Sequence, residues 1–268
     1  MKLTIITINK NNDEGLRQTM ESVVSQSCKD FEYIVIDGAS TDRSVEIIKQ
    51  YAAKNTIDWV SEPDQGIYNA MNKGIAKAKG EYINFMNSGD TLYDSKVVER
   101  MLKEVETHGH PSLLLGQTHV KRANGAIEKA PMNSDFSFLR FYVDSIFHQS
   151  TYFRRDLFDK YGTYDERYQI VSDWKWFLEV IPMKDVQPII VDVNVSIFDT
   201  TGISETCKEL NDKERRQVLE EVVPQGFLQN YDRYTNYIFM VQHLRSHKWA
   251  YKLVSYLDRF LYFLEKMK

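Results

Sequence analysis

Two periods of apolar and polar positions alternate along the first third of the chain, and together they predict strands joined by helices. Runs of consecutive apolar and β-branched residues are typical of buried parallel strands, and they occur at 2–7, 31–36, 57–60 and 81–86. Between them, apolar residues recur at the spacing of amphipathic helices, at 14–26, 44–54 and 66–79. Strand–helix alternation with short connections predicts an α/β fold with a mostly parallel, doubly wound sheet and helices on both faces.

The pattern is less regular beyond residue 94. The elements predicted there are helices at 96–106 and 172–181, strands at 113–117 and 189–193, and a hairpin over 120–127. The hairpin turns at Asn124-Gly125, a favoured two-residue turn. We therefore expect one domain at 1–205, with halves at 1–94 and 95–205, and a C-terminal helical extension at 206–268.

The segment from about residue 229 onward differs in character. It carries an apolar stripe at helical spacing formed by Leu253, Tyr256, Leu257, Phe260, Leu261 and Leu264. Basic residues outnumber acidic ones, and aromatic residues are frequent. This composition is typical of a helix that lies on an anionic membrane surface. Packing of the same helix on the rest of the chain or on another subunit stays open.

Composition narrows the class of protein. The chain has 268 residues, of which 43% are hydrophobic and 27% charged, ordinary values for a globular protein. A net charge of −4 gives no reason to expect nucleic-acid binding. Cys28 and Cys207 fit no metal or redox spacing and indicate a reducing compartment. No segment resembles a signal peptide or a bilayer-spanning run, so we expect a cytoplasmic protein, peripheral at the inner face of the membrane if the tail binds lipid.

Polar side chains stand where the predicted strands end or the next helix begins. They are Asn9, Asp37, Asp64 and Asp90. In open parallel sheets, ligands bind beyond the carboxyl ends of the strands, so these groups point to a site for a nucleotide and a metal ion. A carboxylate at position 37 can accept the imide N–H of uracil. The pattern is typical of an enzyme.

Two further features complete this half of the predicted site. Asn69 and Asn72 lie three residues apart on the polar face of the helix that follows Asp64, where their amides are candidates for contact with a nucleoside or a donor sugar. Asp90 ends the turn Asn-Ser-Gly-Asp. Hard divalent cations take oxygen ligands, often one or two protein carboxylates plus substrate phosphates, so Asp90 is the candidate ligand for Mn2+ or Mg2+.

Several blocks of sequence resemble those of the inverting glycosyltransferases of family 2, in the order and spacing of that family. They are Thr-Ile-Asn at 7–9, Asp-Gly-Ala-Ser-Thr-Asp at 37–42, Asp-Gln-Gly-Ile-Tyr-Asn-Ala-Met-Asn-Lys-Gly at 64–74, and Gly-Glu-Tyr at 80–82 with Asn-Ser-Gly-Asp at 87–90. The resemblance implies the GT-A fold and a nucleotide-sugar donor, for which a UDP-sugar is the favoured candidate. It also implies a saccharide acceptor, and the basic, aromatic C-terminal segment favours a polyprenyl-linked one at the inner face of the membrane, as in cell-surface polysaccharide biosynthesis.

The resemblance assigns roles on the donor side residue by residue. Thr7, Asn9 and Asp37 would hold the nucleoside, and Asp64 would face the base or ribose. Asp90 occupies the last position of the family's Asp-x-Asp metal motif. Ser88 stands where many relatives have the first aspartate, so we place it beside the donor and expect a weaker metal site.

The acceptor side carries fewer signals. Asp173, at a predicted helix start, matches the general base that removes a proton from the acceptor hydroxyl in the family. Trp174 would either form a wall against a sugar ring or pack in the core. His148 is either an acceptor-side residue or a structural one. The segment 199–204 resembles a loop that closes over the diphosphate in related enzymes.

Alternative functions differ in what they require of the sequence. An inactive relative that serves as a scaffold or partner subunit stays open, because Ser88 removes one metal-site carboxylate. Nucleotidyl transfer would need a glycine-rich basic loop after the first strand, but no glycine occurs there before Gly15. A dinucleotide-dependent oxidoreductase would need Gly-x-Gly-x-x-Gly at the same place. The donor sugar, the acceptor and the oligomeric state are not determined by the sequence.

Overall fold

The computed structural model describes residues 1–122, 124–200, 202 and 207–266. The chain forms two compact units, Met1–Arg215 and Arg216–Lys268, and each is described by itself. Our assignment of 1–205 to a catalytic domain and 206–268 to a helical extension stays a prediction. None of the helices in the described part of the chain combines sufficient length with sufficient apolar character to cross a lipid bilayer.

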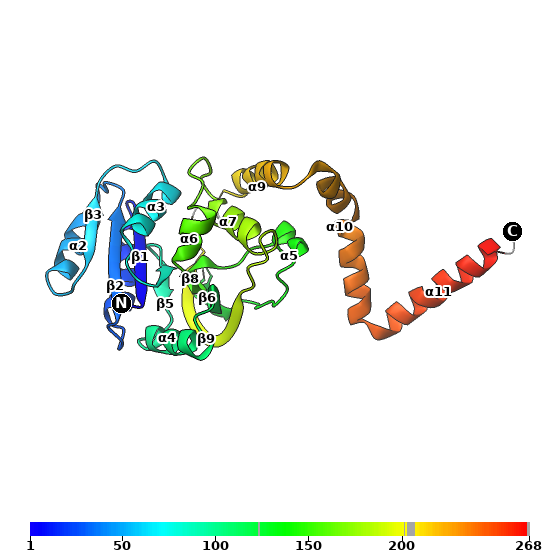
Figure 1. Ribbon diagram of the computed structural model, residues 1–268, viewed down its shortest axis with the longest axis horizontal. Coiled ribbons are helices and arrows are strands. Elements are labelled where there is room, and N and C mark those ends of the chain that lie inside the picture. The colour runs from blue at the N-terminus through cyan, green and yellow to red at the C-terminus, as the bar shows by residue number, and fades with distance from the viewer. Residues whose placement is uncertain (123, 201, 203–206, 267–268) are drawn as a thin grey trace. The chain divides into compact units, whose positions relative to one another are not determined.

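Four parallel strands form the half of the sheet that the alternation predicts (Figure 1). In spatial order they are β3 (Asp58–Ser61), β2 (Phe31–Asp37), β1 (Leu3–Asn9) and β4 (Tyr82–Phe85). Every residue of β1 is buried, which explains its uninterrupted apolar and β-branched run. The register pairs Asn9 with Asp37, and Asp37 with Ser61, at the carboxyl ends of three neighbouring strands.

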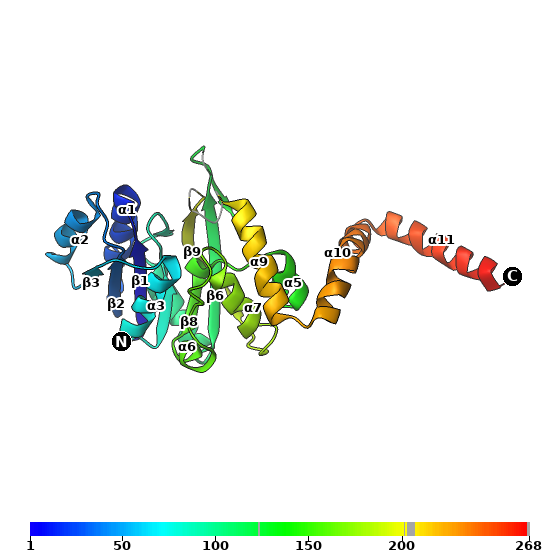
Figure 2. The same cartoon turned by 90° about the horizontal axis from the view of Figure 1, so that it is seen from above.

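Helices cover both faces of these strands, as the sequence predicts. Figure 2 shows α1 (Asp13–Val24) and α2 (Ser44–Ala52) on one face and α3 (Ile67–Lys77) on the other. The side chain of Asn12 accepts a hydrogen bond from the Gly15 amide at the start of α1. Helix α3 packs so closely on β1 that a Cβ at Gly74 would lie 2.5 Å from Ile6 Cγ2.

The second half of the sheet is mixed. It contains β5 (Thr91–Leu92), β6 (Leu113–Lys121), β7 (Ile127–Lys129), β8 (Thr151–Arg154) and β9 (Ile189–Asp199). Strand β8 lies antiparallel between β4 and β6, whereas β6 and β9 are parallel. The predicted hairpin is formed by β6 and β7. The remaining helices are α4 (Val97–Thr107), α5 (Phe138–Val143), the 3-10 turn η1 (His148–Ser150), α6 (Asp156–Tyr161), α7 (Ser172–Val180), α9 (Lys208–Val222), α10 (Gln225–Ser246) and α11 (Lys248–Lys266).

The sheet has a different core on each face. One core is largely aliphatic and includes Leu16, Met20, Val23, Val97, Val98 and Met101 of α1 and α4. The other is aromatic and centres on Phe153 of β8, whose ring lies 5.5 Å from Phe177, 5.5 Å from Trp176 and 5.8 Å from Phe85. Its neighbour Tyr152 belongs to the first core, because successive side chains of a strand point to opposite faces.

Replacement of Phe153 by Ala should therefore destabilise the first unit strongly. The ring is fully buried, and loss of a buried phenylalanine leaves a cavity that costs about 3–5 kcal/mol. Urea unfolding at neutral pH measures the change. Phe227→Ala is the control, since Phe227 is 66% exposed and its loss should change the unfolding free energy by no more than about 0.5 kcal/mol. Equal effects of the two substitutions would contradict the aromatic core.

Candidate active site at the carboxyl ends of the strands

A cavity of about 410 Å³ lies at the carboxyl ends of the parallel strands. Its lining comes from strand ends and loops far apart in the sequence, and it includes Asn9, Asp64, Asp90, His148, Asp173 and Asp199. The sheet topology thus brings together four residues that the sequence selected, namely Asn9, Asp64, Asp90 and Asp173. Ser88 also lines this cavity, and its hydroxyl donates to the backbone carbonyl of Asn12 at 3.2 Å.

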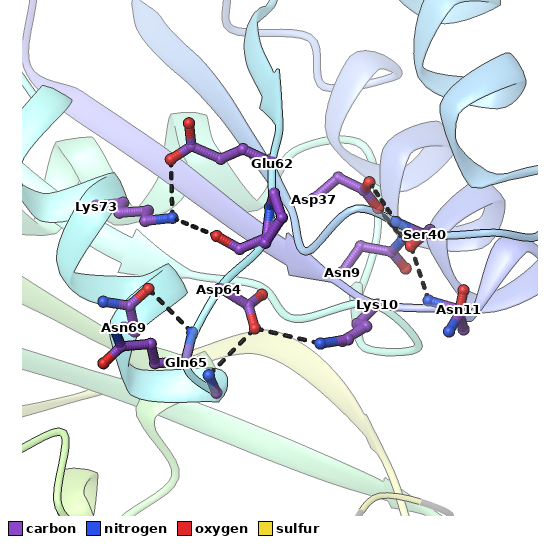
Figure 3. A network of polar contacts seen from close by, with 12 residues as sticks. Asn9, Lys10, Asn11, Asp37, Ser40, Glu62, Asp64, Gln65, Asn69 and Lys73 are labelled. Carbon is purple, nitrogen blue, oxygen red and sulfur yellow. Dashed lines mark hydrogen bonds and ion pairs between the residues drawn. The ribbon is translucent and has the colours of Figure 1, made fainter.

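Asp37 is fully buried and is surrounded by donors. Its Oδ1 accepts from Asn9 Nδ2 at 2.8 Å and Ser40 Oγ at 2.6 Å, and its Oδ2 accepts from Ser61 Oγ at 2.6 Å and the Ser40 amide at 3.0 Å. Burial opposes ionisation, but these hydrogen bonds hold the pKa of Asp37 below its usual value. Figure 3 shows Asp37, Asn9 and Ser40 in this cluster. Direct contact with a uracil imide therefore requires displacement of one of these donors.

Asp64 lies between two strand-end loops (Figure 3). Its Oδ1 accepts from the Gly66 amide at 3.1 Å and faces Lys10 Nζ at 3.5 Å, while its side chain is only 4% exposed. The backbone of Gly38 passes close to the same carboxylate, and a Cβ there would lie 2.2 Å from Asp64 Oδ2. Glycine at position 38 is thus required by the place that Asp64 occupies.

Asp90 is a buried carboxylate that is held from two sides. Its Oδ2 accepts from Gln149 Nε2 at 2.9 Å, and its Oδ1 accepts from the Asp199 amide at 3.0 Å. Burial raises the pKa of Asp90 to about 6, and the two donors only partly offset it. A neighbouring negative charge on Asp199 contributes in the same direction as burial.

The residues around Asp90 suit a cation that needs few protein ligands. Among the described residues no group of three or more His, Cys, Asp or Glu side chains is arranged to hold a metal ion. Asp90 and Asp199 nevertheless line the same cavity, and hard divalent cations accept one or two carboxylates together with phosphate oxygens and waters. This donor set fits Mn2+ or Mg2+ bound jointly with a diphosphate, and it does not fit a closed protein cage.

Asp173, in the first turn of α7, accepts one hydrogen bond on each carboxylate oxygen. Tyr68 Oη donates to Oδ1 at 2.8 Å, and His148 Nδ1 lies 2.9 Å from Oδ2. Burial opposes ionisation, but the donors His148 and Tyr68 hold the pKa of Asp173 below its usual value. An ionised, half-buried carboxylate therefore lines the same cavity as Asn9 and Asp64.

His148 connects Asp173 to the turn that carries Asp90. Its Nε2 lies 3.2 Å from Asn87 Nδ2, so the network assigns a proton to Nδ1, which donates to Asp173, and a lone pair to Nε2, which accepts from the amide. The Oδ1 of Asn87 is buried and has no hydrogen-bond partner among the described residues.

Thr7 and Trp174 lie away from the cavity. The Thr7 hydroxyl is fully buried, where it donates to the Met86 carbonyl at 2.8 Å and contacts Tyr33 Oη at 3.0 Å. The indole N–H of Trp174 donates to the backbone of α5 and the residue that follows it, and the Arg215 guanidinium lies over the ring. Of the two interpretations of Trp174, the structure supports the second, in which the side chain packs in the core.

Asn69 and Asn72 also lie outside the cavity lining. Their amide groups donate to the two carboxylate oxygens of Glu166, and Asn72 additionally exchanges two hydrogen bonds with the backbone of Tyr164. This face of α3 therefore holds the segment that precedes α7. The predicted contact of both amides with a nucleoside or donor sugar has no counterpart in this arrangement.

The structure adds residues to which the sequence assigned no role. Tyr68, Asn87 and Gln149 all line the cavity, and each stands within or next to a segment singled out from the sequence. Of the predicted closing loop, Asp199 and Gly202 line the cavity, whereas Thr201 and 203–204 lie outside the described residues.

Comparison with known proteins decides the family. The model of the family described as "Glycosyl transferase family 2" matches residues 4–164. The chain belongs to glycosyltransferase family 2. An uncharacterized glycosyltransferase of Mycobacterium tuberculosis is 32% identical over 209 residues, 75% of this chain and 76% of that relative. A PGL/p-HBAD biosynthesis glycosyltransferase of the same species is 31% identical over 177 residues, 64% of this chain and 66%, just under two thirds, of the relative.

Solved structures confirm the fold of this family 2 member. Staphylococcus aureus TarS 1–349 in complex with UDP-GlcNAc has a TM-score of 0.64 at 16% identity, over 91% of this chain and 73% of that one. The mannosyltransferase PcManGT of Pyrobaculum calidifontis, in complex with GDP-Man and Mn2+, has a TM-score of 0.63 at 15% identity, over 83% and 64%. The predicted GT-A fold is confirmed.

The closeness of Gly38 and Asp64 gives a testable prediction. Gly38→Ala should destabilise the protein by about 1–3 kcal/mol, because the new Cβ meets the Asp64 carboxylate. Asp64→Ala removes that carboxylate, so the double variant should be more stable than the sum of the two single changes, as a double-mutant cycle in urea measures. Gly226→Ala, whose Cβ would meet nothing within 4 Å, is the control. Strict additivity of the two site substitutions would contradict the close approach.

Proposed function

We propose that the protein transfers a sugar from a nucleotide-sugar, UDP-linked above others, to a hydroxyl group of a saccharide or polyprenyl-linked saccharide, with inversion at the anomeric carbon. The observation that supports this best is Asp173, an ionised carboxylate that faces the same cavity as Asp90. Family membership favours glycosyl transfer, and the proposal extends to cell-surface polysaccharide biosynthesis on the cytoplasmic side of the membrane.

The donor would occupy the side of the cavity formed by the strand-end loops. Asn9, Lys10 and Asp64 line it there, with Asp37 ionised behind Asn9. A divalent cation, when bound at Asp90 and Asp199, would neutralise the leaving diphosphate. TarS binds UDP-GlcNAc, and PcManGT binds GDP-Man and Mn2+. These complexes of related folds favour the same arrangement here. Thr7, Asn69 and Asn72 would support the site from outside.

The acceptor hydroxyl would approach Asp173. Its oxygen attacks C1 of the sugar from the face opposite the diphosphate, and its proton passes to the Asp173 carboxylate. The Tyr68 hydroxyl suits both states of this carboxylate, because Tyr68 Oη lies 2.5 Å from the Ile170 carbonyl as well as 2.8 Å from Asp173. With Asp173 protonated, the tyrosine proton is donated to Ile170, and the tyrosine oxygen accepts from the new carboxylic acid.

The scaffold alternative rests on Ser88, which removes one carboxylate from the metal motif. Asp199 weakens that argument, because it comes from the end of β9 and lines the cavity beside Asp90. The cavity lining therefore includes a second carboxylate from another element of the fold, and its Oδ2 forms an ion pair with Lys121 at 3.2 Å. We propose a metal site built from Asp90 and Asp199, with the Ser88 hydroxyl beside the donor.

Replacement of Asp173 by Asn should slow the chemical step strongly while donor binding persists. Loss of a general base typically costs about 10²- to 10⁴-fold in rate. Sugar transfer from UDP-sugars in the presence of Mn2+ or Mg2+ measures the rate, and calorimetry with UDP and Mn2+ measures donor binding. Asp192→Asn, whose side chain is 97% exposed, is the matched control and should behave as the wild type.

Each other outcome of this experiment has a defined meaning. Full transfer by Asp173→Asn would refute the base assignment. A folded wild-type protein that binds none of UDP, GDP, CDP or dTDP, with or without Mn2+, would refute the proposed function in favour of the scaffold. Binding of a diphosphate other than UDP would refute only the donor preference.

Tyr68→Phe should move the pH dependence of transfer. The hydroxyl stabilises ionised Asp173, so its removal raises the pKa of Asp173, and the acidic limb of kcat/KM should shift to higher pH. The other groups that face Asp173 are His148, Arg215 and Tyr164, and all are retained in this variant. Tyr51→Phe, which loses a hydroxyl bonded to Glu21, is the control. An unshifted acidic limb would show that the Tyr68 hydroxyl does not tune the base.

A further inference from the structure

Helix α11 carries most of its large apolar side chains on one half of its circumference, with Tyr251 and Tyr262 on the other half. At 100° per residue, nine positions fall within this half, and every one of these side chains is at least 41% exposed: Trp249, Leu253, Val254, Tyr256, Leu257, Phe260, Leu261, Phe263 and Leu264. Monomeric proteins rarely expose contiguous apolar surface on this scale without a partner. The apolar half of α11 therefore calls for an occupant.

The charges of α11 are arranged around that half. Lys252, Arg259 and Lys266 are spaced by seven residues, so they form a basic ridge along one border of the apolar half, and all three are exposed. Asp258 lies on the polar half, away from this border. Residues 225–268 carry seven Lys and Arg against three Asp and Glu, a local charge of +4, whereas the whole chain carries −4. The charge thus favours an anionic occupant.

We infer that α11 binds an anionic lipid surface, lying in the plane of the membrane with its apolar half inserted and its basic ridge at the headgroups. An apolar half of this width exceeds the narrow seam of a two-stranded coiled coil and is typical of interfacial helices with Lys and Arg on the polar face. Trp249 and Tyr256 lie within the apolar half, and such amphipathic rings favour the membrane–water interface. A surface of this kind extends the proposed function, because it is where a lipid-linked acceptor would be met.

Vesicle flotation of the full chain tests this inference. The wild type should float with vesicles of phosphatidylcholine mixed with phosphatidylglycerol, and much less with phosphatidylcholine alone or at high salt. Reversal of the basic ridge (Lys252→Glu, Arg259→Glu, Lys266→Glu) should weaken binding to the mixed vesicles at least about tenfold. The matched control reverses three exposed lysines of the first unit, Lys49, Lys54 and Lys103, which changes the net charge equally and should leave binding intact.

A second variant distinguishes insertion of the apolar half into the membrane from attraction of the basic ridge to anionic headgroups. Leu257→Asp with Phe260→Asp should abolish flotation, while UDP binding stays that of the wild type and shows that the protein is folded. No flotation of the wild type, or equal flotation with both vesicle types, overturns the inference. A stable dimer that floats with neither vesicle type, and that Phe260→Asp dissociates in light scattering, would assign the apolar half to a second copy instead. Flotation is measured without donor or acceptor, so its failure leaves the proposed transfer reaction untouched.

Discussion

The in-register pairing of β1, β2 and β3 is the constraint on which the proposed donor side of the site depends. It sets Asn9, Asp37 and Ser61 side by side at the strand ends, and two of these residues then donate to the third. A slip by one residue would turn every side chain to the opposite face of the sheet and leave the Asp37 carboxylate buried without its donors. An unsatisfied buried polar group costs about 1–3 kcal/mol, and a charged one more. The carboxylate is thus part of what fixes the register that positions it.

Two carboxylates of the cavity, Asp90 and Asp173, have pKa values shifted in opposite directions, and the difference follows from their surroundings. Asp90 has two donors against full burial and a negative neighbour, so its pKa rises to about 6. Asp173 is less enclosed, with a side chain that is 18% exposed, and hydrogen bonds from His148 and Tyr68 favour its charged form. A group that must receive a proton at neutral pH has to be ionised before the reaction. The electrostatics therefore suit Asp173 to the role of base and leave Asp90 as the group whose ionisation a cation would favour.

The sequence predicted the strands and helices because their apolar periods are strong, and it predicted Asp64, Asp90 and Asp173 at the cavity because strand ends and helix starts in this fold share one edge. It could not predict hydrogen bonds between residues that lie far apart in the sequence and come together only when the chain folds. Tyr68 reaches Asp173 across 105 positions, and the Asp199 amide reaches Asp90 across 109.

The same limit explains why three of the selected residues, Thr7, Asn69 and Asn72, lie outside the cavity lining. Asn69 and Asn72 were selected because they lie on the polar face of α3, but the segment around Glu166 covers that face. Thr7 follows the strand period of Asn9 yet lies one step deeper in the sheet, where the Met86 carbonyl covers it. The polar face of a helix and the period of a strand identify side chains that need hydrogen-bond partners. They do not show whether those partners belong to the protein or to a ligand.

One connection ties the two halves of the cavity together. Asn87 belongs to the turn that ends in Asp90, and its side chain contacts Nε2 of His148. The other ring nitrogen of His148, Nδ1, contacts Asp173. The next residue in the chain, Gln149, donates a hydrogen bond to Asp90. The Oδ1 of Asn87, which has no hydrogen-bond partner in the described part of the chain, allows this connection two forms. With the amide as described, Nδ2 donates to a neutral imidazole; after rotation of the amide by a half turn, Oδ1 would accept from a doubly protonated one. Asn87 can thus satisfy His148 in both charge states, so a proton shared between His148 and Asp173 would not leave a buried donor unmatched. In the proposed reaction, the turn that carries Asp90 on the donor side therefore also supports the base on the acceptor side.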